Sequence, residues 1–96
     1  MIIRAMKLEM NSISIIDVES NLQSLEEAVS GHFEAINLKD GGVMIANRKG
    51  MLKQYPRNDL ASCISGKHIY GTALIVGYNG KSFDDVPEQY YVWLGN

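Results

Sequence analysis

Cysteine, basic clusters and long apolar runs are all scarce in this chain, and each shortage excludes a class of protein. Cys63 is the only cysteine, so no disulfide forms within the chain and nothing indicates an oxidising compartment. No run of Lys and Arg exceeds two residues and the formal net charge is −2, so the basic face of a duplex-DNA-binding protein is missing. No apolar run approaches the roughly 18 residues that a membrane-spanning helix needs. Because the opening residues also lack the apolar core of a signal peptide, we expect a cytoplasmic protein without membrane or duplex-DNA partners.

The remaining composition is that of an ordinary folded protein. Of the 96 residues, 46% are hydrophobic and 21% are charged, which is outside the range of disordered chains. This length predicts a single globular domain spanning residues 1–96.

The segment from His68 to Tyr78 is the longest run that only a buried strand explains well. Leu74, Ile75 and Val76 are consecutive, which is typical of a strand covered on both faces. Gly71 and Gly77 interrupt the run and indicate a bulge or a close backbone approach. We therefore expect residues 68–78 to form the central strand.

The other elements follow from period and turn signals. Hairpins are predicted at residues 2–9 with 13–19 and at 33–38 with 43–47, and Met51-Leu52 as a further short strand. Amphipathic patterns predict helices at about 21–30 and 87–94, and Asn58 is placed to cap one turn of helix after it. The fold class expected is α+β, with a mostly antiparallel sheet of five or six strands and two helices. In the last helix, Tyr90 and Trp93 are expected to dock inward and Tyr91 to project outward.

The second half of the chain resembles a known family. The matching positions are an apolar strand ending in Asn47, a Pro-x-Asn segment at Pro56 and Asn58, and the pattern Ile69, Gly71, Thr72, Ile75, Val76, Gly77. The family consists of small domain-of-unknown-function proteins carried by bacteriophages, plasmids and integrative elements. The resemblance implies no established activity, but it implies a mobile-element setting in which small proteins often act on host machinery and host defence.

One cluster of residue types suits a binding surface. Arg pairs planar anions through two hydrogen bonds, Tyr supplies contact area, and Asn supplies donors and acceptors. The candidate ligand- or partner-binding residues are Asn47, Arg48, Tyr55, Arg57, Asn58, Lys67, Tyr70, Thr72 and Tyr91. The simpler interpretation of Asn47 and Asn58 is that they cap turns by bonding their own backbone.

Catalytic and metal motifs are weak. One cysteine and two histidines fall short of the four ligands that zinc prefers, so no metal and no cofactor are predicted. A minor enzyme using Cys63 and His68 stays open only if the fold brings the two side chains together.

The functional hypothesis is a non-enzymatic accessory protein of a mobile element that binds and inhibits or modulates a bacterial host or defence protein, as an anti-CRISPR does. The first alternative is a protein that sequesters a small anionic ligand such as a nucleotide signal, for which Arg48, Tyr55 and Arg57 must converge on one cavity. A homodimer through an exposed strand edge or the last helix is a further expectation.

Overall fold

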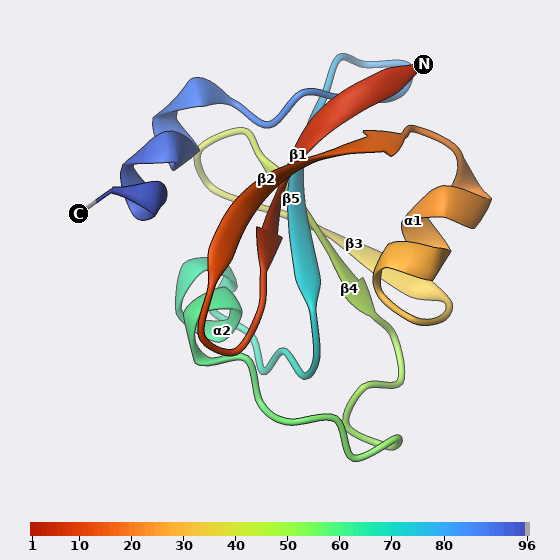
Figure 1. Ribbon diagram of the computed structural model, residues 1–96, viewed down its shortest axis with the longest axis vertical. Coiled ribbons are helices and arrows are strands. Elements are labelled where there is room, and N and C mark those ends of the chain that lie inside the picture. Colours follow the sequence, from red (N-terminus) through yellow and green to blue (C-terminus); the bar gives the residue numbers. More distant parts are fainter. Residues whose placement is uncertain (96) are drawn as a thin grey trace.

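Six antiparallel strands form the sheet in the computed structural model, which describes residues 1–95 (Figure 1). The strands are β1 (Ile2–Leu8), β2 (Ile13–Glu19), β3 (Phe33–Asn37), β4 (Val43–Asn47), β5 (Ala73–Tyr78) and β6 (Phe83–Asp84). Their order is β2-β1-β5-β4-β3, with β6 paired to β5. Helices α1 (Leu22–Ala28) and α2 (Asp59–Ser65) and the 3₁₀ helix η1 (Glu88–Leu94) complete the fold. The α+β class and both hairpins are confirmed.

The central strand is β5, which runs through the middle of the sheet between β1 and β4 (Figure 1). Ile75 lies opposite Met6 on one neighbour and opposite Met44 on the other, and all three are fully buried. Burial on both faces explains why this segment reads as a continuous apolar run rather than an alternating one.

The central strand is shorter than expected, beginning at Ala73 instead of residue 68. Gly71 adopts a left-handed φ of 85°, which bends the chain out of the strand conformation. Before this bend, only an isolated bridge between Arg57 and Tyr70 pairs the segment. The expected strand at Met51-Leu52 is also wrong, because both residues lie in an exposed turn.

The two faces of the sheet carry separate cores. On one face, Met6, Met44 and Ile75 pack with side chains of α2 and η1. On the other face, Ile45 and Leu74 pack with side chains of α1 and with Phe83. This division follows from the alternation of side chains along each strand.

The last helix is present at the expected place but is a 3₁₀ helix. Tyr90 is buried as expected, whereas Trp93 is 43% exposed. Tyr91 does not project freely outward, because it is partly buried against the core beneath η1, and Val92 is the exposed neighbour. Among residues 1–95, no helix has both the length and the apolar character needed to cross a membrane.

Asn58 joins three parts of the fold through one side chain. Its Nδ2 donates to the backbone oxygens of Leu8 at 3.0 Å and Gly71 at 2.9 Å. Its Oδ1 accepts from the Ala61 amide at 3.1 Å, which confirms Asn58 as the N-cap of α2. With 1% of its surface exposed, this amide fixes the end of β1, the start of α2 and the bend before β5.

We therefore expect Asn58→Ala to lower the free energy of unfolding by about 3 kcal/mol, because the cap is lost and two buried carbonyls lose a donor. Asn58→Asp keeps the capping oxygen but not the donor, so a comparable loss is expected. Urea unfolding of the two variants checks this.

Asn11→Ala is the matched control, because Asn11 is exposed in the turn between β1 and β2. A loss for Asn58→Ala no larger than that of the control would contradict the role given to Asn58.

Candidate functional site

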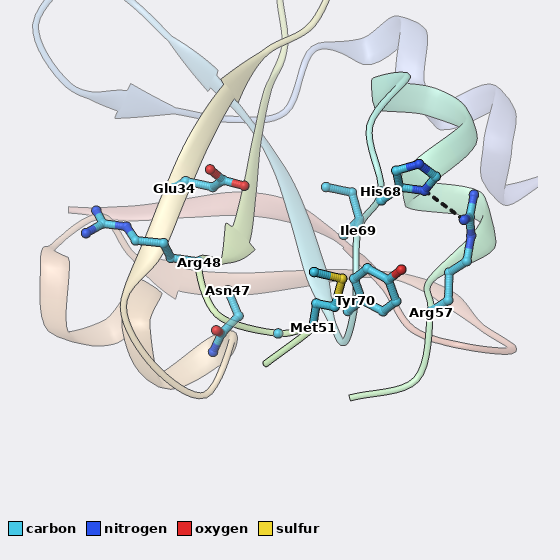
Figure 2. Close-up of a pocket in the computed structure, with 9 residues that line it drawn as sticks. Glu34, Asn47, Arg48, Met51, Arg57, His68, Ile69 and Tyr70 are labelled. Atoms are coloured by element: carbon cyan, nitrogen blue, oxygen red, sulfur yellow. Dashed lines mark hydrogen bonds between the residues drawn. The ribbon is translucent and has the colours of Figure 1, made fainter. Parts of the chain in front are cut away.

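A cavity of about 330 Å³ lies where the ends of β3 and β4 meet the loop 48–57 and the segment before β5. We call it the trough. Figure 2 shows Arg57 and His68 at one end, Glu34 and Arg48 at the other, and Met51 and Tyr70 between them. The remaining lining residues are Asn47, Gly50 and Ile69. The trough thus gathers four of the predicted binding residues, namely Asn47, Arg48, Arg57 and Tyr70.

Arg57 is held by contacts on both sides of its guanidinium group. Its Nη1 lies 2.8 Å from Nδ1 of His68, and its Nε lies 3.2 Å from a carboxylate oxygen of Asp59. The Arg57 side chain is 46% exposed, so the ion pair with Asp59 positions the group more than it stabilises the fold.

Arg48 occupies the opposite end of the trough. Its Nη2 donates to the Phe33 carbonyl at 3.3 Å, at the outer edge of the sheet. Figure 2 shows its side chain extending away from Arg57, so the two arginines line one cavity but do not converge on one point.

The side-chain amide of Asn47 is engaged within the protein. Its Nδ2 donates to the Val29 carbonyl at 3.0 Å, and its Oδ1 accepts from the Lys49 amide at 2.8 Å. These bonds tie the end of α1 to the turn after β4. For Asn47, as for Asn58, the backbone-capping interpretation accounts for the polar atoms. Arg48, Arg57 and Tyr70 are therefore the predicted residues whose side chains face the trough.

Other predicted residues lie elsewhere. Tyr55 and Thr72 line a separate cavity of about 450 Å³ beside the β1–β2 turn. The expectation that Arg48, Arg57 and Tyr55 converge on one cavity is therefore wrong. Tyr70 is the tyrosine that lines the trough with the two arginines. Lys67 is exposed after α2 and lines neither cavity.

Charge is strongly segregated along the chain, although no run of basic residues marks the segregation. Residues 47–70 contain five of the nine Lys and Arg residues but only one of the eleven Asp and Glu residues. This segment therefore carries +4, and the rest of the chain carries −6. The segment builds most of the trough. We call this part of the molecule, residues 47–70, the basic end.

His68 and Glu34 are trough residues that sequence reasoning did not predict as binding residues. The sequence suggests His68 only as a metal ligand or as a partner of Cys63, and Glu34 only as part of the expected strand 33–38. The excess of basic residues between 47 and 70 is the signal that would have drawn attention to His68.

Cys63 does not share a cavity with His68. It lines a third cavity of about 460 Å³, together with Tyr90 and Trp93. No hydrogen bond joins Cys63 to His68 within residues 1–95, so the juxtaposition that an enzyme of this type requires is not found there. That same part of the chain contains no group of three or more His, Cys, Asp or Glu side chains placed to hold a metal ion.

These observations define a small antiparallel α+β domain with a shallow cavity at one basic end. Residues 3–94 match the domain of unknown function DUF3846, and the chain belongs to this family. No curated protein matches the chain.

A solved structure has a similar fold. It is described as the crystal structure of the small RNA methyltransferase HEN1, with 20% sequence identity and a TM-score of 0.71. The similarity covers 98% of this chain but 16% of that chain. At this identity the likeness concerns the fold alone.

The Tyr90 hydroxyl is the one buried side-chain polar atom in residues 1–95 without a hydrogen-bond partner. Burial raises the pKa of Tyr90 above its ordinary value of 10.0. The nearby Gly42 backbone opposes this rise, although it makes no hydrogen bond of good geometry with the hydroxyl, and the Asp40 charge adds to the rise. We expect Tyr90→Phe to raise the free energy of unfolding by about 1 kcal/mol at neutral pH, because it removes an unsatisfied buried group.

The same variant should respond less to alkaline pH. Above pH 10.0 the unfolded chain ionises Tyr90 while the folded chain keeps it neutral, so this contribution to stability is lost as the pH rises. Urea unfolding at neutral and alkaline pH measures both effects, with exposed Tyr78→Phe as the control. A lower stability of Tyr90→Phe than of the wild type would mean that the hydroxyl has a partner.

Proposed function

We propose that this protein is a non-enzymatic binding protein that contacts an anionic surface of a bacterial protein through its basic end. The observation that carries the proposal is the charge segregation, with +4 on residues 47–70 and −6 on the rest. An asymmetry of this kind steers association with an acidic partner and orients the encounter.

The proposal extends to the biological setting. The protein is carried by a phage, plasmid or integrative element, acts in the cytoplasm of a bacterial host, and inhibits or modulates a host or defence factor in the manner of an anti-CRISPR. The support is its membership of a family of small domains without an assigned activity and the placement of Cys63 and His68 in different cavities.

Exposed side chains near the trough supply the contact. Lys49 and Lys53 lie in the turn beside it, and Arg48 and Met51 line it. Met51 and Leu52 are 63% and 76% exposed, so apolar surface lies among the charges. Apolar anchors within a charged surface are common in protein–protein interfaces.

We expect the double substitution Arg48→Glu and Lys53→Glu to weaken capture of a partner from bacterial lysate at least about tenfold, because it reverses charge at the basic end. Quantitative mass spectrometry of the captured protein, at low and high salt, measures the effect. Capture by the wild type should fall as salt screens the contact.

The control is Lys39→Glu with Lys81→Glu, which makes the same change in net charge at exposed positions outside residues 47–70. A partner retained equally by both double variants would contradict docking through the basic end.

A further inference from the structure

We infer that the trough is a binding site for a small phosphate-bearing ligand of the nucleoside monophosphate class. The phosphate lies at the Arg57–His68 end, and the planar body lies against Tyr70 and Met51. This inference rests on the basic end described above but not on the existence of a protein partner.

The Arg57–His68 contact selects one tautomer of the neutral histidine ring. Arginine does not lose its proton in proteins, so Arg57 Nη1 is the donor in the 2.8 Å contact and His68 Nδ1 is the acceptor. The ring proton therefore sits on Nε2, which makes that nitrogen a donor. His68 thus offers an N–H next to the remaining N–H groups of Arg57.

Both side chains are held by a short backbone clip. The backbone amide of Asn58 donates to the Ile69 carbonyl at 2.8 Å, and the backbone amide of Gly71 donates to the Pro56 carbonyl at 2.8 Å. Arg57 and Tyr70 form an isolated antiparallel β-bridge between these two bonds. The clip places Arg57 and His68 on adjoining segments before any ligand arrives. A site arranged in advance loses less conformational entropy on binding.

The donors at this end outnumber the acceptors. Arg57 has five N–H groups, of which the contacts with His68 and Asp59 engage two atoms, Nη1 and Nε. Charge-assisted hydrogen bonds from arginine to phosphate are among the strongest in proteins. The surplus of donors in a segment of charge +4 therefore selects an oxyanion.

The rest of the trough suits a planar body with a donor at its far end. Ile69 is buried in the wall, Tyr70 is half-buried, and Met51 is exposed beside it (Figure 2). Any of the nucleobases can stack on the face of a tyrosine ring, because each has a π-face. Glu34 at the opposite end is an acceptor for an amino or hydroxyl group, and 330 Å³ is within the range of small-ligand sites.

Adenosine 5′-monophosphate is the probe for a first test, because it carries both a phosphate and an amino group on a planar base. We expect it to raise the melting temperature and to shift the ring nitrogen resonances of His68 in ¹⁵N NMR spectra. Before the probe is added, those spectra should show the tautomer with the proton on Nε2. Adenosine and inorganic phosphate, each alone, should bind at least about tenfold more weakly, because each keeps only part of the contacts.

Arg57→Gln and His68→Ala should each weaken binding of the probe about tenfold or more, since each removes charge-assisted or ring donors from the phosphate. Lys81→Gln makes the same charge change as Arg57→Gln at an exposed position in the turn between β5 and β6 and should bind as the wild type does. Both trough variants are checked by urea unfolding, and exposed His68 is the safer of the two for folding.

The inference is overturned if millimolar probe changes neither the melting temperature nor the His68 resonances, or if Arg57→Gln binds as the wild type does. Phosphate alone binding as tightly as the probe would equally overturn it, because the planar body would then contribute nothing. Any of these results leaves the proposed protein contact standing, since that contact is measured by capture with Arg48 and Lys53 variants and without nucleotide.

Discussion

The side-chain amide of Asn58 is the interaction on which the arrangement of this molecule most depends. Its side chain hydrogen-bonds to three elements that are distant in the sequence. The partners are the carbonyl of Leu8 at the end of β1, the carbonyl of Gly71 before β5, and the amide of Ala61 in the first turn of α2. A buried amide that satisfies all its partners rigidifies its surroundings, because an unpaired buried group would be costly. The backbone of Arg57, which lines the trough, is held in place because Arg57 directly precedes Asn58.

Because the sheet is buried on both faces, the side chains that can bind a ligand lie in the loops at its end. β5 pairs with β1 and β4, and its residues 73–77 are buried between the two cores, so those side chains are unavailable to a ligand. The outer edges of β2 and β3 have no neighbouring strand within residues 1–95, which is the condition that a dimer through a strand edge needs. The loop 48–57, at the bottom of Figure 1, combines exposure with positive charge. Surface loops on a rigid scaffold are where binding residues concentrate.

Much of the scaffold could be predicted from local patterns. β2 and β4 begin and end at the expected residues, because period-2 alternation and the Asp-Gly turn are short-range signals. The helix cap at Asn58 could also be predicted, because a cap depends only on Asn58 and the residues that follow it. Of the predicted binding residues, four line the trough: Asn47, Arg48, Arg57 and Tyr70. Their relative placement was not predictable, because it depends on a bridge between segments that no local pattern specifies.

The sequence by itself determined the strands, the hairpins and the excess of positive charge between residues 47 and 70, because period, turn chemistry and composition act over a few residues. Only the tertiary structure decided that residues 68–72 leave the strand at Gly71, that His68 meets Arg57 rather than Cys63, and that Glu34 faces the same cavity. The physical reason is that these outcomes depend on non-local pairing. The backbone of residues 56–58 bonds to that of residues 69–71, and this contact brings together side chains that are eleven residues apart in the chain.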